Sequence, residues 1–524
     1  MSPKSHEFFY VTTPIYYVND VPHIGHAYTT IAADILARFK RLEGCQVFFL
    51  TGTDEHGQKV EKAAQERGVD PKTHCDEMVK RFQSLWKRLN ISNDDFIRTT
   101  EERHKKVVQK ILQALYDRGE IYQDTYQGWY CVPCERFWTE KDLSDGKCPD
   151  CLRPVAEISE KNYFFKMSKY QSWLIDHIEK NDRFILPPSR KNEILGFLRT
   201  PLADLCISRP KKRLAWGIEI PFDADYVTYV WFDALINYVS AIGYDSEGGP
   251  FLKFWPEAIH LVGKDILTTH TVYWPTMLKG VGLTPPWAVF AHGWWTINGK
   301  KMSKSLQNAV EPNRLIDLYG VDAVRYFLMR EVPFGTDGDF SHGAMVHRIN
   351  GDLANDLGNL FSRSLSMVLK YFNGEIPSPD PSAMAEIDVR LKDTAEKAFP
   401  EVSHHIDDIA FNKALASIWE IVNAANKYVD ETAPWALAKD EENRPRLGTV
   451  LYVTLESLRI IALLLAAFMP SISEEMWSQL KMEGSILEQN LKETTKWGGL
   501  IPGNKVEKPI PLFPRIDPSK ISIE

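Results

Sequence analysis

Apolar positions in the first part of the chain alternate between the spacing of strands and that of a helix. Residues 8–17 are rich in aromatic and β-branched side chains, which predicts a strand. Apolar residues from 31 to 39 then follow at helical spacing, and Gly44 marks the expected end of that helix. Residues 46–53 form a second apolar strand that ends at Asp54. This order predicts a doubly wound parallel α/β sheet, with ligands beyond the carboxyl ends of its strands.

The pattern changes twice farther along the chain. Residues 119–216 carry cysteines and aromatics without a strand–helix alternation, which predicts an insertion. After about residue 345 the apolar spacing becomes helical, and residues 498–518 are Pro-rich and expected to be extended. The expected strands after the insertion are residues 226–231, 258–262 and 287–297, and the clearest expected helices are residues 353–369, 409–425 and 450–469.

Composition and charge fit a large globular protein. With 524 residues the chain is too long for one core, and the usual domain size suggests about three domains. An apolar fraction of 44% excludes disorder over most of the length. The net charge of −8 does not indicate a nucleic-acid binder, so any RNA binding must rest on local basic surface. Residues 103–106, 209–213 and 300–304 are candidates, although an ordinary solvated face is the better interpretation of the first two.

Neither a targeting segment nor a membrane span is expected. Residues 1–9 lack the apolar run of a signal peptide. The longest apolar stretch, residues 460–469, is too short to cross a bilayer and adjoins Arg459, so it predicts a buried helix. We therefore expect a cytoplasmic protein with no membrane partner.

Four of the seven cysteines form two CxxC pairs, Cys131 with Cys134 and Cys148 with Cys151. Each pair can direct two thiolates at one point, so together they predict a tetrahedral zinc site. Four protein ligands leave no open position, so the Zn²⁺ is expected to be structural. An empty or degenerate site is the alternative. Cys45, Cys75 and Cys206 have no matching spacing and are expected to be buried or free thiols.

Residues 23–26, which read HIGH, lie between the first strand and its helix. The imidazoles of His23 and His26 can donate hydrogen bonds to phosphate oxygens beside the N–H groups of the helix start. Gly25 has no side chain, so a flat purine could approach the backbone. An ordinary pair of histidines at a helix start is the alternative.

Residues 301–305, which read KMSKS, follow the expected strand 287–297. Lys301 and Lys304, with small serines beside them, can form a cationic loop that closes over a polyphosphate. An ammonium aimed at leaving pyrophosphate would stabilise its developing charge. Taken alone, this motif is better explained as a solvated surface loop.

Together and in this order, the two motifs resemble the signatures of class I aminoacyl-tRNA synthetases, which have a Rossmann-type core. The resemblance implies formation of an aminoacyl-adenylate from ATP with Mg²⁺, followed by transfer to the 3′-terminal ribose of tRNA. It implies catalytic roles for His23, His26, Lys301 and Lys304. The ATP-binding residues implied are His23, Gly25, His26, Gly263, Asp265, Trp295 and Lys304.

Further motifs at residues 12–17, 53–57, 229–234 and 263–266 resemble the methionyl-tRNA synthetase family, and the likeness runs from residue 8 to about residue 515. It implies that Asp54 holds the substrate ammonium. Methionine is flexible and apolar, and its sulfur packs well on aromatic rings. The residues implied around its side chain are Ile15, Tyr17, Trp231, Ala234, Leu235, Tyr238, Ile266 and His270.

Details of the pocket qualify this expectation. Tyr238 and His270 could each point a donor at the sulfur, a weak acceptor. Leu235 and Thr269 depart from the residues that some relatives have at these positions. An apolar pocket rejects a missing methylene weakly, so homocysteine should compete. The interval between Asp54 and Trp231 leaves too little room for an additional editing domain.

The helical half is expected to bind tRNA. Asn355, Asn359 and Arg363 recur every four residues, and Trp435 lies near a predicted helix start. Unpaired bases can stack on an aromatic ring and bond to Asn and Arg. The resemblance implies that Asn359, Arg363 and Trp435 contact the CAU anticodon of tRNA(Met), including initiator tRNA. For each of these residues taken alone, ordinary packing or a surface ion pair is the alternative to a role in binding the anticodon.

The family pattern implies six parts and a monomer. A catalytically inactive tRNA-binding relative and a nucleotidyltransferase with a HIGH-like motif are the alternative functions. The parts are residues 1–118 and 217–297 (the halves of the catalytic domain), 119–216 (the connective insertion with a zinc knuckle), 298–350 (the KMSKS loop and stem-contact region), 351–497 (the helical anticodon-binding domain) and 498–524 (a tail that packs back on the body).

Overall fold

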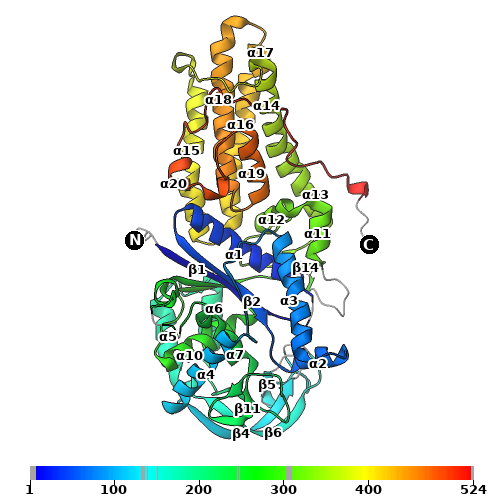
Figure 1. Ribbon diagram of the computed structural model, residues 1–524, viewed down its shortest axis with the longest axis vertical. Helices are drawn as coiled ribbons and strands as arrows, with labels where there is room; N and C mark the ends of the chain where they lie inside the picture. The colour runs from blue at the N-terminus through cyan, green and yellow to red at the C-terminus, as the bar shows by residue number, and fades with distance from the viewer. Residues whose placement is uncertain are drawn as a thin grey trace. The chain divides into compact units, whose positions relative to one another are not determined.

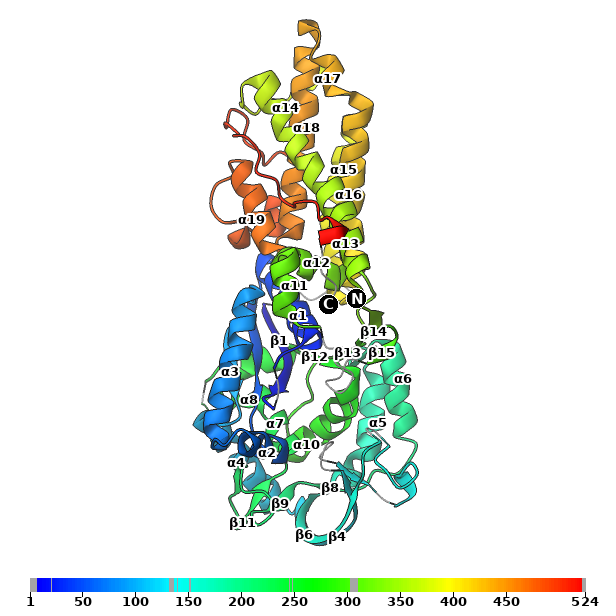
Figure 2. The same cartoon turned by 90° about the vertical axis from the view of Figure 1, so that its right-hand side faces the viewer.

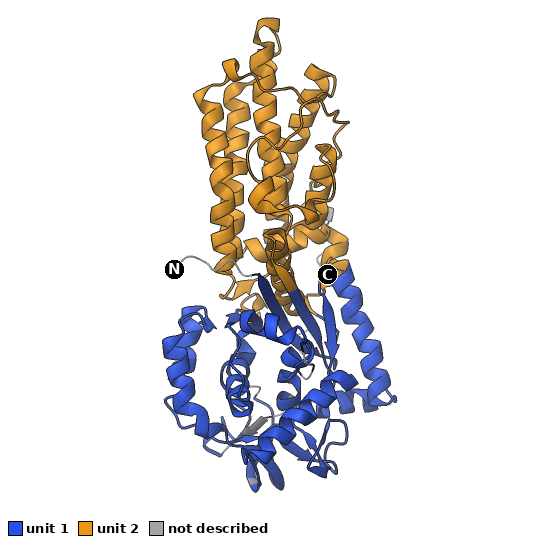
Figure 3. Ribbon diagram, turned by 60° about the vertical axis from the view of Figure 1, so that its left-hand side comes forward, with its two compact units in different colours: residues 1–22, 48–87, 93–292 blue, residues 23–47, 88–92, 293–524 orange. Residues whose placement is uncertain are grey.

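The computed structural model describes residues 7–19, 21–131, 136–138, 140–149, 152–244, 246, 248–301 and 310–520. The chain divides into two compact units, coloured separately in Figure 3. Unit 1 comprises Met1–Pro22, Phe48–Lys87 and Asn93–His292. Unit 2 comprises His23–Val47, Arg88–Ser92 and Gly293–Glu524. Each unit is therefore built from segments that are far apart in the sequence.

The sheet of unit 1 has six strands in the order β3-β2-β1-β12-β13-β7. The pairs β2–β3, β1–β12, β12–β13 and β13–β7 are parallel. The strand order reverses between β1 and β12, and ligands bind at the carboxyl ends of strands at such a reversal. The strands are β1 (Phe8–Tyr17), β2 (Gln46–Asp54), β3 (Asp95–Arg98), β7 (Ile185–Leu186), β12 (Ala258–Gly263) and β13 (Ala288–His292).

The strands predicted at residues 8–17, 46–53 and 258–262 are confirmed as β1, β2 and β12. The prediction that residues 226–231 return to the parallel sheet is wrong. β11 (Asp223–Thr228) lies in the separate antiparallel sheet β10-β11-β9, with β9 at Ser208–Pro210 and β10 at Glu219–Ile220, and a helix starts at Val230. The first half of β11 is exposed or half-buried, whereas strands of a covered parallel sheet are buried on both faces.

The single strand predicted at residues 287–297 is two strands. β13 ends at His292, and β14 (Trp295–Ile297) belongs to the small sheet β15-β14-β16, with β15 at Lys300–Lys301 and β16 at Gly338–Asp339. Gly293 lies between them, where a β-carbon would be only 2.1 Å from the carbonyl oxygen of Thr336. Only glycine permits this close passage of two backbones, and the chain changes sheets there.

The predicted insertion contains a four-stranded antiparallel sheet in the order β5-β4-β6-β8, in which β5 is Arg136–Trp138 and β8 is Leu205–Cys206. Its long strands are β4 (Ile121–Cys131) and β6 (Ala156–Phe165), which pair over almost their full lengths. The insertion also supplies β7, in which Ile185 pairs with Val289 of β13. The insertion is thus continuous with the parallel sheet of unit 1.

Unit 2 contains α1 (Ile24–Leu42) and a bundle of long helices, labelled in Figures 1 and 2. The predicted helical stretches are confirmed. The helices of the bundle are α14 (Asn359–Phe372), α15 (Glu386–Asp407), α16 (Phe411–Thr432), α18 (Arg444–Leu465) and α19 (Pro470–Gln479), with a π-helical segment, Ile349–Gly358, before α14.

Helix α18 is the core of this bundle. The segment Glu441–Leu465 is long and apolar enough to cross a membrane, with a mean hydropathy of 1.7 over its most apolar window. That window is completely buried by the other helices of unit 2, however. An apolar helix covered on all sides is the expected centre of a large bundle.

A buried arginine explains why α1 belongs to unit 2. Arg325, on α12 (Val321–Arg330), donates to Asp34 of α1 at 2.7 Å. The same guanidinium donates to the carbonyl oxygens of Ala467 and Phe468, both at 2.9 Å, just after α18. The middle of α1, the helix that the two histidines begin, is therefore fixed to the bundle.

The tail also packs on unit 2. The backbone N–H of Ile516 donates to Asn350 at 2.8 Å, and the side-chain amide of Asn350 donates back to Ile516 at 2.8 Å. Gln479 and Ile510 exchange a similar pair of hydrogen bonds, at 3.0 and 3.1 Å. These pairs satisfy backbone groups of the extended tail.

Candidate active site

His23 and His26 cap the start of α1. Nδ1 of His23 accepts from the backbone N–H of Gly25 at 3.1 Å, and Nδ1 of His26 accepts from the N–H of His23 at 3.1 Å. The rings stack with centroids 3.8 Å apart. In a neutral imidazole whose Nδ1 accepts, Nε2 carries the proton. The caps therefore leave both histidines with an Nε2–H that can donate to an anion.

The charge state of His26 follows from its surroundings. Desolvation lowers its pKa well below the usual range, and the nearby His23 lowers the pKa further. His26 is consequently neutral at pH 7. Gly25 lies beneath the His23 ring, which a β-carbon at Gly25 would approach to 3.0 Å. A side chain at this position would press on the ring that caps the helix.

The second predicted motif lies mostly outside the described residues. Lys301 ends the short strand β15 (Lys300–Lys301), and its backbone pairs with Thr296 of β14. The side chain of Lys301 and all of residues 302–305, including Lys304, lie outside the described part of the chain. Trp295 is 4% exposed, and its ring packs edge-on against Tyr28 of α1 at 5.7 Å.

The residues predicted to surround methionine all lie in unit 1. Ile15 and Tyr17 end β1, Asp54 ends β2, and the other residues follow β11 and β12. Ile15, Leu235, Tyr238 and Ile266 belong to or pack against one buried apolar cluster. Trp231, Ala234 and Leu235 are on α7 (Val230–Leu235), Tyr238 is on α8 (Asn237–Ser240), and Ile266 and His270 are in the helical turns Lys264–Ile266 and Thr269–Tyr273.

Tyr238 and His270 are hydrogen-bonded to each other. Nδ1 of His270 lies 2.9 Å from the carbonyl oxygen of Ile266, so that nitrogen carries the proton and donates. The hydroxyl of Tyr238 lies 2.8 Å from Nε2 of His270, which must then accept. Burial lowers the pKa of His270 to about 4, which keeps the ring neutral. That each residue points a donor at the methionine sulfur stays a prediction. It requires the Tyr238 hydroxyl to turn away from His270, and it requires His270 to release Ile266 or to carry its proton on Nε2.

His260 is a site residue that the sequence reasoning missed. Trp274 donates its indole N–H to Nε2 of His260 at 3.3 Å, and Nδ1 of His260 lies 2.8 Å from Oγ1 of Thr12. The ring of Tyr238 stacks on His260 with centroids 4.1 Å apart. A histidine in the middle of an apolar strand was the available signal, because a buried polar ring requires partners.

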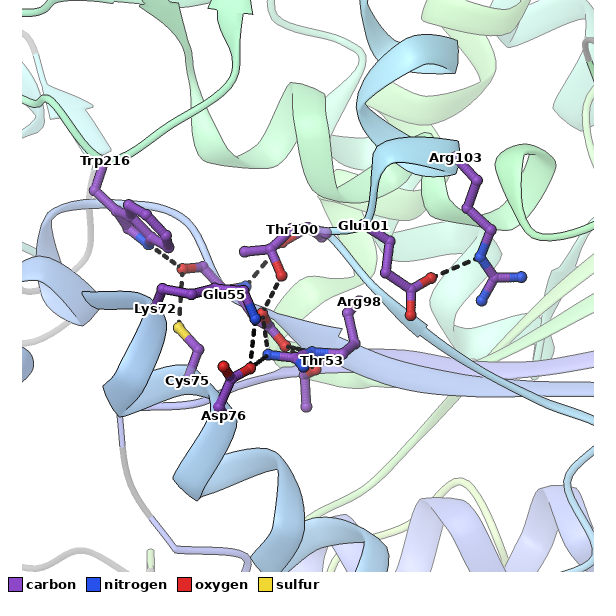
Figure 4. Close-up of polar contacts among 11 residues, drawn as sticks. Thr53, Glu55, Lys72, Cys75, Asp76, Arg98, Thr100, Glu101, Arg103 and Trp216 are labelled. Atoms are coloured by element: carbon purple, nitrogen blue, oxygen red, sulfur yellow. Dashed lines mark hydrogen bonds and ion pairs between the residues drawn. The ribbon is translucent and has the colours of Figure 1, made fainter. Parts of the chain in front are cut away.

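Asp54 is buried at the end of β2, with 3% exposure. The next residue, Glu55, is completely buried and is the centre of the network in Figure 4. Oε1 of Glu55 accepts from Thr53 at 2.7 Å and from Nε of Arg98 at 2.6 Å. Oε2 accepts from Thr100 at 2.6 Å and from Nη2 of Arg98 at 2.9 Å. The bidentate arginine balances the buried charge and fixes the turn that follows Asp54.

The backbone of Glu55 is held as well. Its carbonyl oxygen accepts from the indole N–H of Trp216 at 2.5 Å and from the thiol of Cys75 at 3.6 Å. Its N–H donates to Thr99 at 2.9 Å. Desolvation by burial raises the pKa of Cys75, with the Glu55 charge as the second cause, so this cysteine is a protonated donor. Sequence reasoning singled out Asp54 but not these supports.

Gly263 and Asp265, predicted to meet adenosine, follow one another at the end of β12. Gly263 pairs with His292 of β13, and Asp265 is exposed in the next turn. A β-carbon at Gly263 would lie 2.6 Å from Oδ1 of Asp265. The glycine therefore leaves room for a carboxylate at the carboxyl edge of the sheet.

Two of the four predicted zinc ligands are described. Cys131 ends β4, and Cys148 follows a short turn, and both thiols are completely buried. Cys134 and Cys151 lie outside the described residues. Within the described ranges no group of three or more histidine, cysteine, aspartate or glutamate side chains is arranged to hold a metal.

In unit 2 the predicted anticodon residues occupy α14 and α17 (Pro434–Leu437). Arg363 of α14 donates to Asp430 of α16 at 3.1 Å. Asn359 is exposed, and Trp435 is exposed over 44% of its surface. An exposed tryptophan is available for stacking and contributes little to a core.

Two family models match the chain. The model of class I tRNA synthetases (M) matches residues 9–158 and 153–365, and the anticodon-binding domain of tRNA ligase matches residues 391–510. Methionine–tRNA ligases from Caldanaerobacter subterraneus subsp. tengcongensis and Clostridium perfringens are each 52% identical, over 98% and 97% of this chain and 79% and 78% of their own lengths. The chain belongs to the methionyl-tRNA synthetase family.

Solved structures of the family agree. Methionyl-tRNA synthetase of Mycobacterium tuberculosis in complex with methionyl-adenylate has a TM-score of 0.93 and 43% identity, covering 97% of this chain and 100% of its own. The apo form of that enzyme has a TM-score of 0.84 and 40% identity, with 98% and 99% covered. Methionyl-tRNA synthetase activity is the function of this chain, and the inactive tRNA-binding alternative is not favoured.

Proposed function

We propose that the residues at the carboxyl ends of β1, β2 and β12 bind L-methionine, and that His23 and His26 bind the phosphates of ATP. The observation that carries the proposal is the pairing of Tyr238 with His270 in an apolar cluster beyond the strand-order reversal. A buried apolar pocket with few polar groups suits an unbranched thioether side chain. Asp54, at the end of β2, supplies the negative charge for the substrate ammonium.

Activation requires attack of a methionine carboxylate oxygen on the α-phosphorus of ATP. The bond to pyrophosphate breaks, and methionyl-adenylate forms. The Nε2–H groups of His23 and His26 donate to phosphate oxygens, and Lys301 and Lys304 add positive charge where pyrophosphate departs. Mg²⁺ supplies further positive charge at the phosphates when it enters with ATP.

Transfer then uses the activated carbonyl carbon. A hydroxyl of the 3′-terminal ribose of tRNA attacks it, and AMP leaves with the electrons of the broken bond. The anticodon end of tRNA(Met), including the initiator, binds Asn359, Arg363 and Trp435. Support comes from the exposure of Trp435 and from the fixed position of Arg363 beside Asp430.

We also infer a structural zinc ion held by Cys131, Cys134, Cys148 and Cys151. Cys131 and Cys148 are completely buried, and the described residues next to Cys148 are mostly exposed, which fits thiolates gathered around a metal. Zinc would fix the conformation of a segment that has little apolar mass. The closed set of four ligands gives it no part in the reaction.

The experiment that tests the enzymatic proposal is aminoacylation of tRNA bearing a CAU anticodon, with all twenty amino acids in parallel. Methionine should be charged in strong preference to leucine and isoleucine. A preference for either branched amino acid would overturn the assignment of the pocket. Methionine-dependent exchange of pyrophosphate into ATP, without tRNA, measures the first step by itself.

A further inference from the structure

Asp233 is a buried carboxylate that faces two histidines from separate parts of unit 1. Its Oδ2 lies 2.7 Å from Nδ1 of His56, and its Oδ1 lies 2.7 Å from Nε2 of His104. The side chain of Asp233 is 0% exposed, and those of His56 and His104 are 4% and 0% exposed. The reaction described above uses none of these three residues.

The protonation of this trio follows from its geometry. An ionised carboxylate only accepts, so the facing nitrogen of each histidine must carry a proton. Burial alone would raise the pKa of Asp233, but the two histidines more than offset it and lower the pKa. Nδ1 of His104 in turn lies 2.9 Å from the hydroxyl of Ser240. The trio is a continuous buried polar network.

The network joins the elements that carry the proposed methionine-binding residues. His56 is in the turn after β2, two residues after Asp54. Asp233 is on α7, between Trp231 and Ala234. Ser240 is on α8, two residues after Tyr238, and His104 is in the first turn of α4 (Glu102–Asp117). The turn after β2, α4 and α7 therefore meet at one carboxylate, and α8 joins this network through His104.

We propose that Asp233 is a positioning residue for methionine, which holds the turn that follows Asp54 at a fixed spacing from the helix that carries Trp231. This inference rests on the proposed function. Asp54 meets the ammonium of methionine and Trp231 meets its side chain, so both ends of one small molecule depend on this spacing. Small displacements of groups that bind a substrate have large effects on its use.

Stability alone does not explain the network. Replacing a buried ion pair by apolar groups of similar volume is often neutral or stabilising. The turn after β2 also has its own support, because Arg98, Thr53 and Thr100 surround Glu55 without Asp233 (Figure 4). Loss of the Asp233 charge is therefore expected to leave the turn folded while its spacing from α7 relaxes.

The first test is Asp233→Asn in methionine-dependent pyrophosphate exchange. The side-chain amide of asparagine presents one acceptor and one donor, whereas the N–H groups of His56 and His104 require two acceptors. The KM for methionine should rise on the order of tenfold, as expected for misplaced binding groups, while the KM for ATP stays within about twofold. An equal rise in both constants, or an unchanged KM for methionine, would overturn the proposal.

Asp388→Asn is the matched control. Asp388 is also completely buried, and it accepts from Tyr428 at 2.5 Å and from Arg446 at 2.9 Å in the bundle of unit 2. This variant should lose thermal stability but keep the wild-type KM for methionine. A raised KM for methionine in the control would show that any buried charge defect has the same effect, and the proposal would fail.

Replacement of His104 tests the network without removing the carboxylate. His104→Gln retains a side-chain N–H donor, whereas His104→Leu has none. Titration of methionine binding by tryptophan fluorescence, in the absence of ATP, should show weaker binding for the leucine variant and near-normal binding for the glutamine variant. Equal affinities in the two would overturn the proposal, and this pair decides the matter if Asp233→Asn does not fold.

The two levels of proposal fail separately. A wild-type protein without methionine-dependent exchange would refute the proposed function itself. A wild-type protein that is active, with Asp233 and His104 variants that bind methionine normally, would refute only the positioning role.

Discussion

The hydroxyl of Tyr238 and Nε2 of His270 are 2.8 Å apart, and the second nitrogen of His270 is committed to the carbonyl oxygen of Ile266. The direction of each hydrogen bond follows from that commitment. Tyr238 donates and His270 accepts, and both side chains are at most 2% exposed. The predicted methionine pocket therefore contains a preformed polar pair, which has consequences that can be measured.

Tyr238→Phe should weaken both the fold and the binding of methionine. It leaves Nε2 of His270 buried without its donor, which costs about 1–3 kcal/mol. The free energy of unfolding in urea should fall by that amount, and the KM for methionine should rise. Tyr452→Phe is the control, because Tyr452 donates to Leu500 at 3.1 Å inside unit 2 and should affect stability alone. A Tyr238 variant with wild-type stability would contradict a hydrogen bond between Tyr238 and His270.

Buried neutral histidines should make the fold sensitive to acid. Burial lowers the pKa of His270 to about 4 and that of His260 well below its usual range. An unfolded histidine takes up its proton near pH ~6.5, so below that pH the unfolded state binds more protons than the folded state. By linkage, the stability due to these groups is complete above about pH 6.5 and is lost as pH falls toward the folded pKa.

The size of this effect can be isolated at His270. When the pH falls from about 7.5 to about 5.5, one such histidine lowers the free energy of unfolding by about 1.4 kcal/mol. The free energy of unfolding differs between these two pH values, and His270→Gln should reduce that difference by about the same amount. His404→Gln, at a side chain that is 71% exposed, should leave the difference unchanged. If His270→Gln shows the wild-type difference, His270 is not the neutral group inferred here.

Lys304 provides a test of the ATP reaction. Lys304→Ala should slow methionine-dependent pyrophosphate exchange at least about tenfold, because one electrostatic stabiliser of the leaving group is lost. Lys508→Ala, at an exposed position of the tail, should leave the rate unchanged. Unchanged exchange in the Lys304 variant would remove this residue from the mechanism.

Much of the fold could be predicted from local patterns. The strand β1 has the predicted bounds, and α1 ends at Leu42, two residues before the predicted stop at Gly44. These elements have strong apolar spacing and clear end signals. Residues 226–231 were misjudged because a local pattern does not tell which sheet a strand joins. Antiparallel pairing of residues 226–228 with β9 decided the sheet, and the aromatic stretch becomes helical at Val230.

The candidate site was predictable only in part for a similar reason. Motifs indicated Asp54, Tyr238 and His270, whose chemistry is recognisable from the sequence. The supports Glu55 and Asp233 depend on partners such as Arg98 and His104, which are many residues away and are brought close only by folding. No local pattern identifies such pairs, because the burial that makes them necessary is a property of the whole unit.

The zinc inference is tested by metal analysis. Freshly purified protein should contain about one equivalent of zinc, as expected for one four-cysteine site. Cys148→Ser should lower the zinc content and destabilise the insertion, since a buried ligand is lost. Cys206→Ser is the control, because this buried cysteine lies outside the CxxC pairs. Less than half an equivalent of zinc in the wild-type protein would count against the site.

Trp435 distinguishes tRNA recognition from adenylate formation. Its ring is 44% exposed at the start of α17, so removing it should cost little stability. Base–aromatic stacking contributes about 1–3 kcal/mol per base, so Trp435→Ala should reduce the efficiency of tRNA charging by about tenfold or more while pyrophosphate exchange is unchanged. Met384→Ala, at another exposed apolar residue of unit 2, should affect neither assay. Equal losses in both assays for Trp435→Ala would indicate a folding defect and exclude a specific role in binding the anticodon. The reason is that a contact with a tRNA base cannot slow pyrophosphate exchange, which takes place without tRNA.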